Sequence, residues 1–270
     1  MVVQHNMAAS NANRQLGIST NVLSKSTEKL SSGYRINRAA DDAAGLSISE
    51  KMRSQIRGLN KASSNAQDGI SAIQTAEGAL NEAHSILQRM NELATQAAND
   101  TNTTVDRNAI QSEINALTSE VSRIASTTQF NTQNLLDGTF SSKNLQVGAL
   151  NGQKIAIDID TMNATALSVN ALCVSTFADA GKAMSAVQKA IEKVSKQRSS
   201  LGALQNRLEH TVNNLDNVAE NTQTAESRIR DTDMASEMVQ YSATSIIQQA
   251  GQSMLAQANS QTQGVLSLIQ

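Results

Sequence analysis

The most regular hydrophobic pattern in the chain lies between Ala66 and Ala97. Its apolar residues recur at alternating steps of three and four, as on a helix that buries one side. These residues are Ile73, Ala76, Leu80, Ala83, Leu87, Met90, Ala94 and Ala97. A second apolar row beside the first consists of Ala72, Ala79, Ile86 and Leu93. The two rows fill three positions in seven, which predicts a long helix in a bundle rather than in a two-stranded seam.

Three further stretches extend this bundle. A helix over residues 47–62 leads into the first one, and a polar run at residues 99–104 ends it. The apolar residues of the return helix are Ile110, Ile114, Leu117, Val121 and Ile124. Because the loop between them is short, we expect these two helices to be antiparallel. A third long helix runs from Phe177 to about Thr222, and its pattern leaves its direction open.

The hydrophobic period changes from helical to alternating between residues 130 and 176. The apolar residues that alternate with polar ones are Leu145, Val147, Ile155, Ile157 and Ile159. Between the two alternating runs, Asn151 and Gly152 are the residue types of a tight type I′ turn. The pattern therefore predicts one β-hairpin near residues 144–160.

Apolar residues are sparse at both ends of the chain. Between Val2 and Leu30 they are separated by Asn, Ser, Thr and Gln. The last predicted helix begins at Met234, and its thin stripe consists of Met238, Ile246, Ile247, Ala250, Met254, Leu255 and Ala258. Neither stripe can hold an isolated helix in water. Each terminal helix therefore needs a partner, and we expect both to be largely disordered until they find one.

Charged residues cluster where each terminal helix meets the bundle. The N-terminal cluster contains Arg35, Arg38, Asp41 and Asp42. The C-terminal cluster contains Arg228, Arg230, Asp231 and Asp233. Either Asp41 or Asp42 can cap the helix that follows. The two clusters lie about equally far from the two chain ends, so they either face one another or form two unrelated solvated loops.

These patterns predict a mainly α protein: a long antiparallel helical bundle with one β-hairpin, plus paired N- and C-terminal helices. Residues 45–227 form the predicted helical core, while residues 1–44 and 228–270 form the terminal region with its connectors. Composition agrees, because the 270 residues include no proline and only 2% are aromatic. The helices can run unbroken, and Ala, Leu, Ile, Val and Met must fill the core.

Charge and hydropathy exclude several kinds of partner. The 22 basic and 24 acidic residues leave a net charge of −2, and no block of Lys or Arg stands out. We therefore expect no nucleic-acid partner. No apolar run reaches the length of a membrane span, and the first residues lack an apolar leader with a cleavage site. We expect neither a membrane-embedded segment nor a cleavable signal peptide.

The residues that usually carry chemistry are few and scattered. The three histidines, His5, His84 and His210, are far apart, and no His or Cys spacing typical of a metal site occurs. There is no Gly-rich phosphate loop and no evident partner for a nucleophilic cysteine. Apolar neighbours on both sides predict that Cys173 is a small buried hydrophobe. We expect no cofactor, no metal and no enzymatic activity.

Four segments carry a resemblance to a known family. Residues 29–50 and 68–80 resemble the N-terminal signature of bacterial flagellins. Residues 228–235 and the tail at 265–270 resemble the C-terminal region of that family, although Gln270 stands where the family often has a basic residue. The resemblance covers almost the whole chain. Larger flagellins insert outer domains after the hairpin, and those domains are missing here because the helical pattern resumes by Phe177.

The resemblance implies a structural subunit that polymerises into the extracellular flagellar filament used for motility. It also implies export of the unfolded subunit through the flagellum's channel, with an export chaperone that holds the C-terminal segment. Assembly would proceed beneath a filament cap, alongside hook-associated proteins. The residues expected to serve polymerisation are the two charged clusters and four apolar residues of the tail, Val265, Leu266, Leu268 and Ile269.

One further expectation concerns recognition by a vertebrate host. In flagellins, an Arg and a Leu that match Arg89 and Leu93, with a Glu that matches Glu113, form part of the patch bound by the Toll-like receptor for flagellin. The resemblance implies that these residues form such a patch here. Pattern alone favours another interpretation, in which Leu93 closes the core while Arg89 and Glu113 are ordinary solvated charges.

Two other functions are compatible with parts of the pattern. A hook-filament junction protein shares the terminal helices but normally has a different central region. A coiled-coil signalling module would explain the heptads without any filament, and it would keep stable helical ends in a small closed oligomer. A filament subunit should instead form an open polymer.

Overall fold

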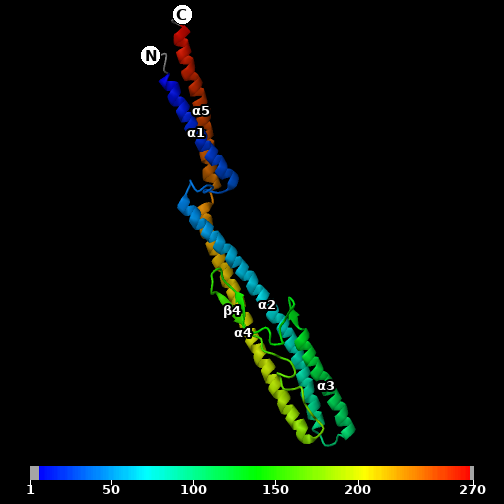
Figure 1. Cartoon of the computed structure of the whole chain (residues 1–270). Coiled ribbons are helices and arrows are strands. Elements are labelled where there is room, and N and C mark those ends of the chain that lie inside the picture. Colours follow the sequence, from blue (N-terminus) through cyan, green and yellow to red (C-terminus); the bar gives the residue numbers. More distant parts are fainter. Residues whose placement is uncertain (1–5, 268–270) are drawn as a thin grey trace. The chain divides into compact units, whose positions relative to one another are not determined.

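The computed structural model describes residues 6–267, with the backbone alone at residues 262 and 265–267. The five helices of this part are α1 (Met7–Ser32), α2 (Ala43–Ala97), α3 (Thr104–Thr127), α4 (Phe177–Arg230) and α5 (Met234–Ser267) (Figure 1). The predicted mainly α fold class is confirmed. The chain divides into two compact units: a terminal unit, up to residue 54 and from residue 221, and a central unit, residues 55–220. The expected boundaries at residues 44 and 228 differ, since α2 and α4 each contribute residues to both units.

The predicted bundle forms the core of the central unit. Along α2 the side chains of Ile73, Leu80 and Leu87 are fully buried, as the heptad stripe predicts. Three contacts settle the direction of α4, which the pattern left open: Thr95 with Met184, Glu77 with Arg198 and Ser63 with Asp216. As residue numbers rise along one helix they fall along the other, so α4 runs antiparallel to α2.

The predicted hairpin consists of β3 (Lys143–Gln146) and β4 (Lys154–Ile157), paired from Lys143 opposite Ile157 to Gln146 opposite Lys154. The predicted type I′ turn is wrong. Such a turn requires positive φ at both central residues, but of the pair Asn151 and Gly152 only Gly152 has it, at 87°. The Gln153 N–H donates to the Leu150 carbonyl, as in a type II turn, which needs positive φ only at its third residue.

A second, smaller hairpin was not predicted. It pairs β1 (Gln129–Phe130) with β2 (Gln133–Asn134). The two residues between these strands, Asn131 and Thr132, have φ values of 46° and 64°, so both central positions of this turn are left-handed. Nothing in the sequence signals this turn, because it contains no glycine and places a β-branched residue in a conformation that such residues rarely adopt.

The first connector is shaped by its two aspartates and by Gly33. Gly33 ends α1 with a φ of 75°, and its N–H donates to the Lys29 carbonyl. Asp42 is the cap of α2, since its Oδ1 accepts from the Gly45 N–H at 2.8 Å. Asp41 instead folds the connector, because its Oδ2 accepts the N–H groups of the two residues at 37 and 38. These donors lower the pKa of the Asp41 carboxyl.

Candidate assembly interface and neighbouring sites

The terminal helices α1 and α5 pair along their lengths, as predicted, and they run in antiparallel directions (Figure 1). Near one end, Asn6 Nδ2 donates to the Ala258 carbonyl at 2.9 Å. Further along, Gln248 Nε2 lies 3.3 Å from Thr20 Oγ1. Near the other end, Lys29 Nζ lies 3.5 Å from Glu237 Oε2. These contacts define one register.

The residues of α1 and α5 that face each other form a seam, and on each helix they recur with heptad spacing. Its buried and half-buried residues on α1 include Ala9, Ala12, Leu16, Ser19, Leu23, Ser26 and Leu30. Those on α5 include Glu237, Tyr241, Thr244, Gln248, Gly251, Leu255 and Ala258. The α5 side of the seam is therefore mostly polar or small, and it supplies little hydrophobic burial.

Most of the large apolar side chains of α5, though not Leu255, point away from this seam. Their exposed fractions are 51% for Met238, 72% for Val239, 67% for Ile246, 58% for Ile247 and 65% for Met254. We call these five residues the outer face of α5. Single exposed apolar residues are common on protein surfaces, but five on one helix mark a contact surface.

The two connectors face one another. Tyr34 and Asp231 form an antiparallel bridge. The Arg35 N–H donates to the Arg230 carbonyl at 2.7 Å, and the Thr232 N–H donates to the Gly33 carbonyl at 3.0 Å. Of the two alternatives for the charged clusters, the facing arrangement is therefore the one that the structure contains.

Arg230 is the most enclosed of the clustered charges, with 13% of its side chain exposed. Its Nη1 lies 2.8 Å from Glu50 Oε1, and its guanidinium carbon lies 4.8 Å from the centre of the Tyr34 ring. A cation held over an aromatic face and beside a carboxylate is stabilised by both. Nearby, Arg35 donates to the Ile229 carbonyl and Ser49 donates to Glu226. These contacts hold the end of α4 to the start of α2 inside the terminal unit.

The helix expected to end at about Thr222 instead runs to Arg230, so Arg228 and Arg230 belong to α4 rather than to a connector. Both lie in the last turn of α4, where the negative end of the helix dipole stabilises a positive charge. Asp231 accepts from Ser227 Oγ at 2.6 Å. Asp233 accepts the N–H of Ala235 at 2.9 Å and so caps α5. The side chain of Arg38 forms an exposed ion pair with Glu28.

The side chains of the four apolar tail residues lie outside the described part of the structure. Val265 and Leu266 lie in the last turn of α5, but their side chains are not among the described ones. Leu268 and Ile269 lie outside the described residues.

The expected receptor residues lie on α2 and α3 in the central unit. Arg89 Nη2 is 3.0 Å from Glu113 Oε1, and its Nη1 is 3.2 Å from Glu92 Oε2. The hydrogen bonds that Arg89 donates to Glu113, and then to Glu92, raise the pKa of Arg89. Leu93 is only 2% exposed, so in the single subunit it packs in the core. The second row of the heptad stripe turns Leu93 into the core, and only the charged pair reaches solvent.

Cys173 is exposed, so the prediction that it is buried is wrong. Its neighbour Val174 is fully buried, and successive residues of an extended segment point in opposite directions. Val174 therefore takes the inward position and Cys173 the outward one. The Ser175 hydroxyl lies 3.1 Å from Cys173 Sγ, and hydrogen bonding to Ser175 lowers the pKa of the thiol.

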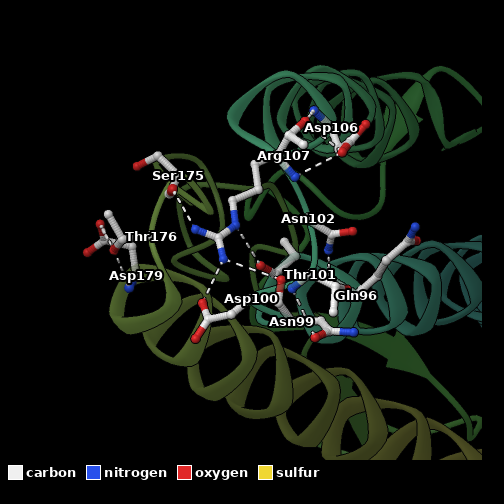
Figure 2. Close-up of polar contacts among 12 residues, drawn as sticks. Gln96, Asn99, Asp100, Thr101, Asn102, Asp106, Arg107, Ser175, Thr176 and Asp179 are labelled. Atoms are coloured by element: carbon white, nitrogen blue, oxygen red, sulfur yellow. Dashed lines mark hydrogen bonds and ion pairs between the residues drawn. The ribbon is translucent and has the colours of Figure 1, made fainter.

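The sequence did not signal the Arg107 cluster, which ties three segments of the central unit together (Figure 2). Arg107 Nε donates to the carbonyl of Ala97, the last residue of α2, at 3.1 Å. Its Nη2 donates to the Asn99 carbonyl at 3.3 Å and to Asp100 Oδ1 at 3.0 Å. Its Nη1 donates to the Ser175 carbonyl at 3.4 Å. One guanidinium thus joins the end of α2, the following loop and the segment before α4.

A capping box places Arg107 at the start of α3. Thr103 and Asp106 exchange hydrogen bonds between side chain and backbone. The hydrogen bonds from Thr103 lower the pKa of the Asp106 carboxyl. The capping box therefore persists above the ordinary pKa of an aspartate and weakens only when pH falls through the lowered value.

Residues 6–267 contain neither a metal-binding cluster nor a helix that could span a membrane. No group of three His, Cys, Asp or Glu residues in this range is arranged to hold a metal ion. No helix in the same part of the chain combines the length and apolar character needed to cross a bilayer.

The paired terminal helices and the exposed outer face of α5 define a helical subunit that needs further copies to cover it. Comparison with known proteins gives the family. Residues 3–141 match the family model of the bacterial flagellin N-terminal helical region, and residues 184–269 match that of the C-terminal helical region. The chain belongs to the bacterial flagellin family.

Relatives support this along the full length. The chain is 55% identical to a flagellin of Halalkalibacterium halodurans and 50% identical to a flagellin of Bacillus subtilis, in each case across 100% of both chains. The crystal structure of Bacillus cereus flagellin is similar with a TM-score of 0.50 at 30% identity, over 56% of this chain and 88% of that one. The chain is therefore a structural subunit of the flagellar filament, in a family of structural proteins rather than enzymes. Nothing favours the junction protein or the signalling module.

Proposed function

We propose that the outer face of α5 is the surface through which this subunit polymerises and that a second copy of the same chain covers it. The observation that carries this proposal is the reversed pattern of α5. The residues that it turns toward α1 are mostly polar or small, while Val239, Ile246 and Ile247 are exposed. Burying such side chains supplies about 1.5–3 kcal/mol each, which the isolated pair of helices forgoes.

The charge of α5 supports a second copy as the occupant. Glu237 is the single charged residue in its sequence, and that residue is buried in the seam. The outer face therefore carries no charge to attract a basic or acidic partner. A neutral apolar helix suits an equally neutral helix of another subunit. A contact between unlike surfaces that does not close into a ring produces a filament.

We further propose that assembly orders the terminal unit. The seam between α1 and α5 has few large apolar residues, so the pair by itself gains little from burial. In this view, residues 1–44 and 228–270 act as the polymerisation region. Contacts between the connectors, including the hydrogen bond from the Arg35 N–H to the Arg230 carbonyl, then hold the two segments of this region together.

Negative-stain microscopy of refolded protein under precipitant tests polymerisation. The full chain and a version ending at Asp233 are compared. We expect long filaments from the full chain and none from the shortened one, because removal of α5 deletes the apolar outer face. Small closed oligomers from both versions would instead contradict polymerisation through the terminal helices.

Export and assembly partners follow from family membership. We propose that the subunit leaves the cell unfolded through the flagellum's channel. A chaperone would hold the C-terminal segment, whose apolar outer face otherwise risks premature association. Filament-cap and hook-associated proteins would contact the assembled ends. If this is right, the version ending at Asp233 should also fail to bind the export chaperone in a pull-down.

We also propose that Arg89 and Glu113 contact the vertebrate Toll-like receptor for flagellin. Their side chains are exposed and already paired at 3.0 Å, so the patch is preorganised. Leu93 would not contact the receptor directly, and it would position Arg89 by packing α2 into the core. The variant R89A/E113A should lower receptor signalling about tenfold or more, since charged interface residues of this kind cost 1–2 kcal/mol or more when truncated. R123A/E120A, which removes another exposed pair on α3, should signal like the wild type, and equal loss in both would refute the patch.

A further inference from the structure

We infer that the ion pair between Lys29 and Glu237 sets the register of α1 against α5. Glu237 is 7% exposed, and its Oε2 lies 3.5 Å from Lys29 Nζ. Among the described residues, no donor reaches its other oxygen, Oε1. Lys29 is therefore the one cation that compensates this buried carboxylate in the described structure.

The bridge between Tyr34 and Asp231 holds the two helices together at one end only, and the seam beyond the ion pair has little power to fix the register. Both rows follow heptad spacing, so a slide of seven residues brings each seam position opposite another seam position. Such a slide moves α5 by about 10 Å along α1. Small or polar residues such as Ala12, Ser19 and Gly251 neither clash nor lose much burial after the slide. The neutral contact of Thr20 with Gln248 is easily replaced, since Ser, Thr and Gln recur on both helices.

A slide would break the connector bridge, and within the seam it would leave the buried carboxylate of Glu237 without its cation. One heptad toward the start of α1 places Glu237 opposite Val22 instead of Lys29. One heptad in the other direction carries it past Ser32, the last residue of α1. Either slide separates the buried carboxylate from its cation, which is strongly unfavourable. A single buried polar or charged pair is the known means by which coiled helices specify register.

Register matters for assembly because it positions the outer face of α5 along the terminal unit. This consequence rests on the proposed polymerisation through that face. A slide of about 10 Å would displace Val239, Ile246 and Ile247 from the positions at which a second copy meets them. The ion pair thus selects one assembly-competent alignment, while the apolar face supplies the energy of association.

Disulfide trapping reads the register directly in the full-length chain. All variants carry Cys173→Ser to remove the exposed thiol. Leu16→Cys with Gly251→Cys reports the native register, because a Cβ at Gly251 would lie 3.5 Å from the Leu16 side chain. Leu16→Cys with Thr244→Cys, and Leu16→Cys with Ala258→Cys, report slides of one heptad in either direction. Oxidation is performed under the precipitant conditions used for assembly.

With Lys29 and Glu237 intact, we expect the native cross-link to exceed each slid one by about tenfold or more. K29E and E237K should each abolish this preference, since each places two like charges in the seam. The exchanged pair K29E/E237K should restore it. The reversed control R38E/E28R, at an exposed ion pair of the same unit, should leave the preference unchanged.

Two outcomes overturn the inference. An unchanged native preference in K29E and E237K would show that apolar packing sets the register. Failure of the exchanged pair to restore the preference would show that the two residues do not act through their charges. Cross-linking does not require filaments, so absence of filaments from the wild type would refute the proposed polymerisation while leaving this test readable.

Discussion

The variant V239S/I247S should raise the concentration of free subunit at which filaments form by about a thousandfold. Both side chains are more than half exposed in the single subunit. If a second copy covers them, each contributes about 1.5–3 kcal/mol to the addition of a subunit. Replacement by serine removes this gain, and a combined loss of about 4 kcal/mol corresponds to a factor of about a thousand in the equilibrium constant. Sedimentation of assembled from free protein measures this concentration.

A control variant in the central unit distinguishes the loss of an assembly contact from the effect of making any exposed apolar residue polar. Val105 and Phe177 are as exposed as the two α5 residues but lie outside the terminal unit. V105S/F177S should therefore polymerise at the wild-type concentration. Neither double variant should lower the unfolding temperature of the central unit, because exposed apolar residues supply little folding energy. Wild-type assembly by V239S/I247S would show that filament contacts lie elsewhere.

Helices were predictable wherever apolar residues repeat over several turns. The stripe of Ile73, Leu80 and Leu87 is buried because only one face of a helix repeats at three and four residues. Because this stripe spans many turns, a single residue that departs from the pattern does not change the prediction of a helix. The direction of α4 was not predictable, because its apolar stripe has the same spacing in either direction. Contacts such as the ion pair of Glu77 with Arg198 determine that α4 runs antiparallel to α2.

Short irregular segments were less predictable because their geometry depends on distant contacts. Asn151 and Gly152 have the composition of a type I′ turn, but the β3–β4 loop is longer and only Gly152 takes positive φ. The left-handed pair is instead Asn131 and Thr132, and although Asn tolerates this conformation, a β-branched Thr rarely adopts it. The direction of Cys173 likewise follows from which neighbour faces inward, and apolar neighbours on both sides do not decide that.

The candidate interface was predictable in part. The thin stripe of α5 indicates a helix that needs a partner, but it does not say which partner. The structure turns Glu237 and Thr244 toward α1 and leaves Ile246 and Ile247 exposed, so the apolar stripe is available to another subunit. Among the connector charges, sequence spacing could not separate Arg230, enclosed beside Tyr34 and Glu50, from an exposed residue such as Arg38.

Replacement of Arg107 by alanine should destabilise the central unit by about 3 kcal/mol, the upper range for hydrogen bonds to a charged group. The Arg107 side chain is mostly buried, and it donates to the carbonyls of Ala97, Asn99 and Ser175. Without it, the last carbonyls of α2 lose a donor and the segment before α4 is released. For a unit of this size, the loss lowers the unfolding temperature by roughly 6–12 °C, measured by circular dichroism on the full chain.

Two variants test whether the guanidinium acts by joining three segments rather than by its charge. R107K keeps the charge but lacks the planar fork, so one ammonium can reach only some of the carbonyls, and most of the loss should remain. R123A removes an exposed pair with Glu120 on the same helix and should cost no more than about 0.5 kcal/mol. Stability of R107K equal to that of the wild type would mean that the charge alone is sufficient. A loss in R123A as large as in R107A would mean that any arginine of α3 matters equally, and the cluster would then have no special role in closing this end of the bundle.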